Sequence, residues 1–406
     1  MTHDDEESKK NDGRTACARI FASLRPLVLS PQMTTNLVRA AALALLQETS
    51  LAEYLSRRPP SHPVTLNESS SVGEALCTLS RHRILSAPVL SAANGDVLGF
   101  FSAQDALAAF VKDISPSLLR GTADLDSRAD ELALAGAEFC SASLRSVAFG
   151  GDGALAYATS KSSASMLDVV SRLSPVFLDD ARCNHRMAVW DLDGVDANGD
   201  DAMRVVSVVS QSDVTRFLAK HADQLPGIDA LTVQDVGLAC KPVLTVSTDT
   251  AVLAAFALLA REKRGAIGVT DESGALVANL SASDLRGLTP ARARWSLLAL
   301  SVRDFLIAQH GQELPAPPVM LESPSPASAT VSVGIARQRE AEEAGKYVAV
   351  VTVQPTTLLS AVLLALSQFG IHQLYVTDAE NKPVSIVTHT DLFRVRRLRC
   401  QPRARD

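Results

Sequence analysis

Four segments of this chain carry the same short pattern: an apolar strand that ends in Ser or Thr, then two residues, then Asp and the start of an apolar helix. The four acids are 108, 71 and 107 residues apart, so the first recurs as the third after 179 residues and the second as the fourth after 178. This spacing indicates a pair of repeats that occurs twice. The hydroxyl and acid residues are Ser102 with Asp105, Ser210 with Asp213, Ser281 with Asp284, and Thr388 with Asp391.

A threonine upstream of the pattern keeps the same phase. In repeats one, three and four an apolar strand carries Thr65, Thr245 or Thr352, and the hydroxyl residue of the pattern follows after 37, 36 and 36 residues. The best counterpart in repeat two is Thr159, which lies 51 residues before Ser210. The surplus predicts an insertion in repeat two.

Each repeat has the pattern of a strand, a helix, two strands and a helix over about 60 residues, the size of a supersecondary unit. Apolar residues at helical spacing predict the first helix of repeat three, and Gly274 predicts its turn. We expect strands in repeat three at 243–246, 266–270 and 276–280, helices at 251–262 and 283–288, and a turn at 271–274. A unit of this size cannot bury its sheet alone.

Surplus segments lie between and within the repeats. Residues 115–145 form a linker that can be helical, whereas 311–345 are rich in Pro and then in charged residues, which predicts a mobile loop. We expect a flexible tail at 1–30, repeat one at 31–114, repeat two at 146–222, repeat three at 228–290, repeat four at 299–398, and a basic tail at 399–406.

Composition limits the classes of function. The chain has 406 residues and a net charge of −6, which argues against a general polyanion binder, so nucleic acid is not an expected partner. No apolar run reaches the roughly 20 residues that cross a bilayer, and the acidic start lacks the features of a secretory signal, so no membrane association is expected. The six cysteines form no CxxC pair, so neither a disulfide framework nor a zinc site is predicted, and a reducing compartment fits best.

Other local motifs are weaker. The segment 151–156 fits the GxGxxG/A turn of nicotinamide-dependent enzymes but lacks the surrounding strands and helices, so we expect a loop. The acidic segment 191–201 lacks the Gly and the terminal Glu of a calcium loop and predicts a hairpin loop. The Arg-rich segment 394–405 fits a nuclear-localisation or nucleic-acid patch, but more often such a run is a solvated helix end. HExxH, GxxxxGK[ST] and GxSxG are absent, no metal site is predicted, and no catalysis is expected.

The repeated hydroxyl and acid pattern has two interpretations. In a helix capping box the hydroxyl accepts a hydrogen bond from a first-turn amide, and the acid accepts one from the amide of the capping residue. In a binding site the helix start and the hydroxyl hold a phosphate, and the acid accepts hydrogen bonds from both hydroxyls of a ribose. Capping alone would accept Asn or Glu, yet all four sites combine a hydroxyl with Asp, so the second interpretation gains weight.

At these segments the chain resembles CBS modules, the cystathionine-beta-synthase type, arranged as two so-called Bateman pairs. It is similar in particular to the gamma regulatory subunit of AMP-activated and sucrose-nonfermenting-related protein kinase, plant and algal type. The segments are 99–107 (GFFSAQDAL), 206–214 (VSVVSQSDV), 280–288 (LSASDLRGL) and 386–393 (IVTHTDLF), and the resemblance covers roughly residues 50–398. It implies an α/β fold of four β-α-β-β-α modules, paired into two Bateman units that form a pseudo-symmetric disk with ligand clefts between paired modules.

The resemblance also implies which basic residues meet nucleotide phosphates. His185 and Arg186 match the family's His-Arg step before a strand, and His372 takes the same place in repeat four. The chain departs from the family where Gln373 replaces an Arg, Leu85 a basic residue, and Ser212 a Lys. Repeat two therefore has the most complete set, and repeat one is the first that we expect to be empty. The alternative for His185 and Arg186 is a solvated strand entrance.

Taken together, the resemblance implies an energy-sensing regulatory subunit that turns nothing over. Its ligands would be AMP, ADP or ATP, with no cofactor, and its partners a kinase catalytic alpha subunit and a beta subunit. It would work in the cytoplasm and also in the nucleus. Two alternatives stay open: a stand-alone sensor of an adenosyl ligand with another partner, and a scaffold whose clefts bind no nucleotide.

Overall fold

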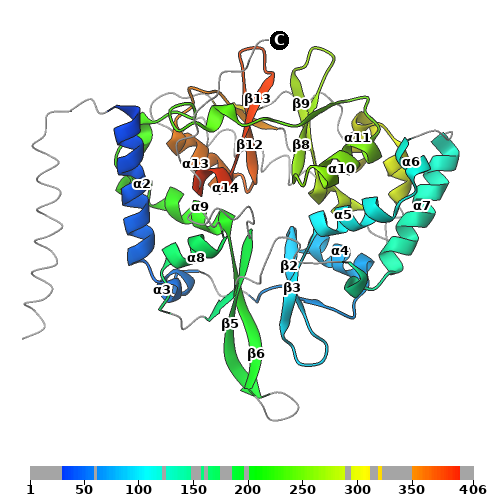
Figure 1. Ribbon diagram of the computed structural model, residues 1–406, viewed down its shortest axis with the longest axis horizontal. Coiled ribbons are helices and arrows are strands. Elements are labelled where there is room, and N and C mark those ends of the chain that lie inside the picture. Colours follow the sequence, from blue (N-terminus) through cyan, green and yellow to red (C-terminus); the bar gives the residue numbers. More distant parts are fainter. Residues whose placement is uncertain are drawn as a thin grey trace, which may run out of the picture.

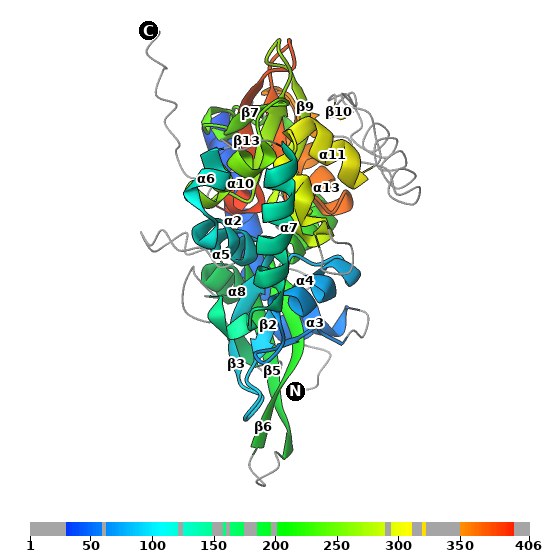
Figure 2. The same cartoon turned by 90° about the vertical axis from the view of Figure 1, so that its right-hand side faces the viewer.

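The computed structural model is a flat disk with one β-sheet in each quadrant (Figure 1). A quarter turn shows the narrow edge of this disk (Figure 2). The structure describes residues 30–58, 62–120, 125–147, 157–159, 163–173, 185–195, 201–288, 294–310, 319–321 and 350–393.

All four repeats share one sheet topology. The first strand pairs in parallel with the second, and the second pairs antiparallel with the third. Repeat one contains β1 Leu66–Asn67, α4 Val72–Arg81, β2 Ser86–Leu90, β3 Val97–Ser102 and α5 Ala103–Asp113. Repeat two contains β4 Tyr157–Thr159, α8 Met166–Leu173, β5 Arg186–Val195, β6 Asp201–Ser210 and α9 Gln211–Lys220.

The second half of the chain repeats this order. Repeat three contains β7 Thr245–Ser247, α10 Val252–Arg261, β8 Ala266–Thr270, β9 Leu276–Ser281 and the 3-10 helix η5 Ala282–Gly287. Repeat four contains β11 Val351–Val353, α13 Leu359–Gln368, β12 Gln373–Thr377, β13 Pro383–Thr388 and α14 His389–Phe393. The predicted α/β fold of four β-α-β-β-α units is therefore confirmed.

The segment that precedes each repeat packs on the other repeat of its pair. α2 Pro31–Glu48 and α3 Leu51–Ser56 precede repeat one, yet the Leu51 amide donates to the Ala164 carbonyl of repeat two at 2.8 Å. Equivalent antiparallel bridges join Ser50 to Ser165, Ser71 to Ser143, Thr232 to Leu358, and Ala251 to Ser301. This exchange joins repeat one to two and repeat three to four. It also shows that 31–58, which we expected within repeat one, packs on repeat two.

Apolar side chains join the two pairs into one body. The largest core spans repeats one and three and contains the fully buried rings of Phe101, Phe256 and Phe305. A second core fills repeat four and takes Val38 from α2, and a third fills repeat two and takes Leu46. Helix α5 packs against α10, and α9 packs against α13, across the middle of the disk.

The remaining described elements connect the repeats. The linker 115–145 is helical in its described part, which confirms that option. The connecting elements are α6 Pro116–Arg120, α7 Leu125–Ser141, η1 Leu144–Ser146, η2 Ala222–Gln224, η3 Ile228–Ala230, η4 Leu238–Cys240, η7 Trp295–Ala299 and α11 Val302–His310.

Three predictions need correction. The last helix of repeat three is a short 3-10 helix. The acidic segment 191–201 belongs to a hairpin, but most of it is strand and not loop. Strand β5 extends to Val195 and β6 begins at Asp201, because these two strands stay paired beyond the end of β4. Residues 319–321 of the expected mobile loop form β10 Val319–Leu321, which pairs in parallel with β11 and so satisfies its backbone groups there. The predictions for 1–29, 151–156 and 394–405 lie outside the described residues.

Of the described cysteines, Cys77 and Cys140 are free thiols and Cys240 is disulfide-bonded. Spacing along the sequence does not report which side chains meet in space, so the absence of CxxC could not exclude a disulfide. Among the described helices, none has the length and apolar character needed to span a membrane.

Candidate functional site

All four hydroxyl and acid pairs form closed capping boxes at the strand-to-helix junctions. In repeat two the Ser210 amide donates to Asp213 Oδ2 at 2.8 Å, its hydroxyl donates to the same oxygen at 2.7 Å, and the Asp213 amide donates back to Ser210 Oγ at 3.2 Å. Ser102 with Asp105 and Thr388 with Asp391 repeat these bonds, and Ser281 with Asp284 forms the fourth box. The capping interpretation is therefore right for every copy. In each box the capping residue donates to Oδ2 of the acid, and Oδ1 takes no part in the box.

The same box also occurs where no ligand cleft is expected. Ser165 with Asp168 caps the first helix of repeat two at distances of 2.8, 2.8 and 3.2 Å. Thr232 with Asp235 and Ser301 with Asp304 form similar bonds in the connecting segments. A hydroxyl with Asp is thus a general capping device of this chain, so the pattern alone does not define a binding site.

Register along the sheets aligns the residues that lead into each second strand. Ser86, Arg186, Ala266 and Gln373 each stand opposite the hydroxyl residue of their own repeat. The preceding residues are Leu85, His185, Gly265 and His372. The structure therefore places His185 and His372 at equivalent positions, as predicted, and gives only repeats two and four a basic residue there.

Arg186 links the two repeats of the first pair at the middle of the disk. Its Nη1 donates to Ser86 Oγ of repeat one at 2.7 Å. Burial lowers the pKa of Arg186 to about 10, nearby Asp213 opposes this effect, and the charge of Arg286 from repeat three adds to it. Arg286 donates from Nη1 to the Ile84 carbonyl at 2.8 Å, which brings a second guanidinium to the entrance of repeat one.

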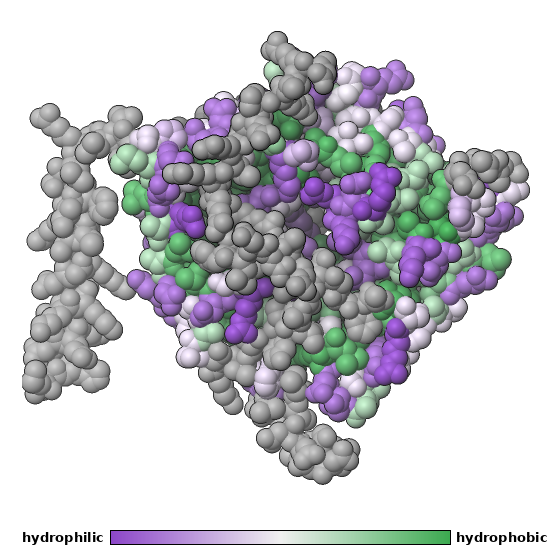
Figure 3. Space-filling model, viewed as in Figure 1, coloured by the Kyte–Doolittle hydropathy of each residue, from purple (hydrophilic) through white to green (hydrophobic). Residues whose placement is uncertain are grey.

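Two histidines of repeat four meet repeat two at the same centre. His389 is buried, with Nε2 3.0 Å from Ser212 Oγ and Nδ1 2.9 Å from Thr215 Oγ1. His372 lies with Nδ1 3.3 Å from Ser212 Oγ, and the two imidazole rings are 5.8 Å apart. We call Arg186, Arg286, His185, His372 and His389 the central basic cluster. Figure 3 shows the face of the disk seen in Figure 1, with hydrophilic side chains above and to the right of its centre.

Burial and neighbouring positive charges lower the pKa values of His372 and His389. Burial lowers the pKa of His389 to about 4; a hydrogen bond with the Ile371 backbone opposes this, while the charges of Arg216 and His185 reinforce it. The pKa of His372 is lowered for the same first reason and by the charge of Arg186. The His372 residue is exposed to solvent whereas His389 is buried, so the pH dependence of stability should come from His389.

Two of the four acids hold a cation from an exchanged segment. Asp213 Oδ1 lies 2.9 Å from Arg216 Nη1 and 3.6 Å from Arg58 Nη2, and Arg58 precedes repeat one. Lys241, which precedes repeat three, donates from Nζ to Asp391 Oδ1 and Oδ2 at 3.0 and 2.8 Å. A ribose at either acid must therefore compete with a cation for the carboxylate.

The strand threonines differ from one another. Thr352 is fully buried in β11, and its hydroxyl finds no hydrogen-bond partner among the described residues. Thr245 is exposed at the start of β7, next to Gly268. In the second pair, Gln373 Nε2 and Tyr375 Oη both donate to Asn279 Oδ1, at 3.0 and 2.6 Å. Gln373 is the counterpart of Arg186, so a neutral hydrogen bond between repeats replaces the charged one of the first pair.

Sequence reasoning missed several residues of this region. Arg216 and Arg286 follow the Asp of the pattern within three residues, so extending the comparison would have found them, whereas His389 lies inside the pattern, between Thr388 and Asp391. Arg58 and Lys241 carry no local signal, because each reaches a site about 150 residues away through the exchanged segments.

Lowering the pH should destabilise the protein through His389. Because its folded pKa lies below the ordinary value of about 6.5, the unfolded chain binds more protons at mildly acidic pH, and stability falls as pH drops through that value. Between about pH 7 and pH 5.5 we expect this residue to account for a loss of about 1 kcal/mol. Urea unfolding of wild type and His389→Gln at both pH values measures it. Equal losses in both proteins would contradict the assignment.

Comparison with known proteins agrees with this architecture. The family model described as the CBS domain matches residues 52–112 and 348–397, which are parts of repeats one and four. No curated protein matches the sequence. A solved structure from Methanocaldococcus jannaschii, described as a candidate archaeal homolog of g-AMPK, is 15% identical, with a TM-score of 0.53 over 84% of this chain and 98% of that chain.

Two further solved structures are more distant. An uncharacterized conserved protein from Pyrococcus horikoshii is 15% identical over 82% of this chain and 95% of that one, with a TM-score of 0.37. A CBS domain pair from protein MJ0100, in complex with 5′-methylthioadenosine and S-adenosyl-L-methionine, is 17% identical over 40% of this chain and 94% of that one, with a TM-score of 0.26. Two segments of the chain therefore match the CBS domain, and the likeness to the first structure shows a shared fold.

Proposed function

We propose that this protein is an adenine-nucleotide-binding, energy-sensing regulatory subunit of the gamma type, within a heterotrimeric Ser/Thr protein kinase. The central basic cluster is the observation that carries the proposal. It gathers basic side chains from repeats two, three and four, and burial holds the pKa values of Arg186 and His389 below their ordinary values. A bound anion would stabilise the charged forms of these groups, so the cluster suits phosphate.

The nucleoside end of the ligand would lie at the strand-to-helix junctions. The second carboxylate oxygen of a boxed acid can accept a ribose hydroxyl, as Asp213 Oδ1 now accepts from Arg216. In repeat four the buried Thr352 hydroxyl offers a polar contact that no described residue uses. Together the two ends favour AMP, ADP or ATP over a ligand without phosphate.

Regulation would follow from differential affinity rather than from catalysis. The centre of the disk is built from side chains of different repeats, as in the contact of Ser212 with His389. A ligand that binds one arrangement of the repeats better than another shifts their equilibrium and thereby biases a partner. We propose catalytic alpha and beta subunits as partners, and the cytoplasm and nucleus as locations, by analogy with gamma subunits alone.

A scaffold or a sensor of another adenosyl ligand is the second candidate. The observation in its favour is that Asp213 and Asp391 already hold Arg216 and Lys241, and that identical boxes occur outside the junctions. If the acids serve only as helix caps, nucleotide affinity will not depend on them.

Titration calorimetry with AMP, ADP, ATP and S-adenosylmethionine tests nucleotide binding. We expect at least one site of micromolar affinity for an adenine nucleotide, and Asp213→Ala should weaken it about thirtyfold, equal to about 2 kcal/mol. The matched control is Asp168→Ala, which removes a similar capping box away from the cluster. Asp105→Ala should matter less than Asp213→Ala. No binding of any ligand at millimolar concentration would leave only the scaffold.

The kinase assignment has a separate test. Affinity purification of the chain from its native cells should recover a kinase catalytic subunit in stoichiometric amount. If nucleotides bind and no kinase is recovered, the adenosyl-ligand sensor replaces the gamma subunit.

A further inference from the structure

We infer a second binding site, separate from the central basic cluster, for a small organic anion with an apolar body. The site is a cavity of about 780 Å³ at the edge of the disk, between α4 of repeat one, α7 of the linker and η7 before repeat four. This volume is in the usual range for small-molecule sites, about 300 to 1,000 Å³. None of its lining residues belongs to the central basic cluster.

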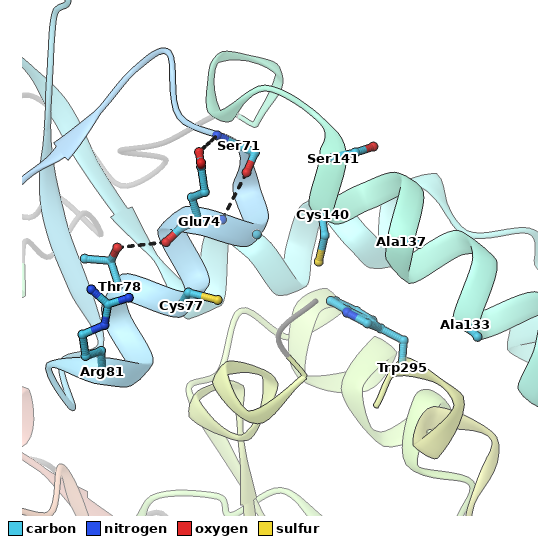
Figure 4. Close-up of a pocket in the computed structure, with 11 residues that line it drawn as sticks. Ser71, Glu74, Cys77, Thr78, Arg81, Ala133, Ala137, Cys140, Ser141 and Trp295 are labelled. Carbon is cyan, nitrogen blue, oxygen red and sulfur yellow. Dashed lines mark hydrogen bonds between the residues drawn. The ribbon is translucent and has the colours of Figure 1, made fainter. Parts of the chain in front are cut away.

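The walls of the cavity are mainly apolar. Ala133, Ala137 and Cys140 face it from α7, and Cys77 faces it from α4 (Figure 4). Burial raises the pKa of the Cys140 thiol to about 11, so this side chain is neutral and acts as a small apolar group. Such walls favour a hydrocarbon or aromatic body over a sugar or a free nucleotide.

The charge at the rim selects an anionic end group. Arg81 lines the cavity from the last turn of α4, is exposed, and forms no ion pair within the described part of the chain. Glu74 also lines it, but its carboxylate accepts the Ser71 amide at 2.8 Å in a capping box. The guanidinium is therefore the group that can meet a ligand, and it pairs best with a carboxylate or a sulfonate.

The floor is the Trp295 ring, which other aromatic rings hold in place. Its centroid lies 4.6 Å from that of Phe110 and 5.8 Å from that of Phe139. Trp295 is 2% exposed and packs on Gly136, where no other side chain would fit. Because the ring is almost fully covered and held in place, the shape of the floor is fixed before binding, and a preformed site loses little entropy when a ligand binds. Trp295 also provides a fluorescent reporter inside the site.

The probe for this site is 8-anilinonaphthalene-1-sulfonate, an apolar aromatic anion that fluoresces in dry surroundings. Added to the full-length protein, it should saturate at one molecule per chain and accept excitation energy from Trp295. Ala137→Phe fills the cavity from an exposed wall position and should lower the affinity at least about tenfold. Leu134→Phe on the same helix, 64% exposed and outside the cavity, is the matched control and should bind as wild type.

Further variants assign the two ends of the ligand. Arg81→Ala should weaken binding about tenfold, whereas Arg81→Lys should retain most of it. Asp213→Ala should leave the probe unaffected, which separates this site from the proposed nucleotide clefts. The inference is overturned if several probe molecules bind without saturation, if Ala137→Phe binds as wild type, or if Leu134→Phe weakens binding equally. Thermal unfolding of each variant confirms that it is folded before binding is compared.

Discussion

Arg186→Ala should lower the affinity for ATP by about ten- to a hundredfold and leave the affinity for adenosine nearly unchanged. Arg186 is a partly buried cation of the central basic cluster, and its hydrogen bond to Ser86 at 2.7 Å holds the guanidinium between two repeats. A charge-assisted bond from such a group to a phosphate contributes about 1.5 to 3 kcal/mol, because little water competes for it. Adenosine has no phosphate and therefore reports only the nucleoside end.

Folding should not obscure this result. Removing Arg186 takes away a partly buried charge whose solvation was reduced on folding, and Asp213 keeps its bond to Arg216 at 2.9 Å. We therefore expect an unchanged or slightly raised unfolding midpoint. Arg261→Ala, which removes an exposed guanidinium paired with its neighbour Glu262, is the control and should bind ATP as wild type. Equal losses of ATP and adenosine affinity in Arg186→Ala would show that the residue only supports the fold.

The repeats could be predicted from the sequence because their signals are local. Val252, Ala255, Phe256 and Leu259 follow helical spacing and are all buried in α10. The turn at Gly274 has a φ of +82°, a conformation that glycine adopts without strain. Four copies of the same pattern then fixed the order of strands and helices even where single signals were weak.

The exchange of leading segments could not be predicted in this way. A helix such as α2 shows the same apolar spacing whether it packs on its own repeat or on a neighbour. Consequently Arg58 and Lys241, which reach Asp213 and Asp391 through this exchange, were outside every local comparison. His389 lies inside the repeated pattern, but its contacts with Ser212 and Thr215 of another repeat leave no signal in the sequence.

The number of copies of the repeated pattern does not separate a binding role from a capping role. Four phased copies of hydroxyl and Asp favour binding over capping alone, yet Ser165 with Asp168 forms the same bonds outside the junctions. The junctions differ from the other capping boxes because Arg186 and His389 lie beside them. Arg186 comes from the start of a strand and His389 from the start of a helix, and each contacts another repeat. Tertiary contacts, and not the sequence pattern, therefore distinguish a candidate binding site from an ordinary helix cap.

Gly136→Ala should lower the free energy of unfolding by up to about 2 kcal/mol, a large effect for a single methyl group. A Cβ at Gly136 would overlap the ring of Trp295, which is itself held by Phe110 and Phe139. Overpacking of this kind costs about 1 to 3 kcal/mol, and the better helix propensity of alanine offsets only about 1 kcal/mol of it. Urea unfolding of both proteins measures the difference.

The matched control is Gly265→Ala, because no atom lies within 4 Å of the Cβ that it adds. Its free energy of unfolding should stay within about 0.5 kcal/mol of wild type. In a Trp295→Ala background the cost of Gly136→Ala should shrink by more than half, since the two residues interact directly and such pairs are not additive. If Gly136→Ala is as stable as wild type, α7 can move away from η7. The contact between Gly136 and Trp295 at the floor of the cavity at the edge of the disk is then not rigid. In that event the cavity would lose its preformed shape, and the affinity of the sulfonate probe should fall with it.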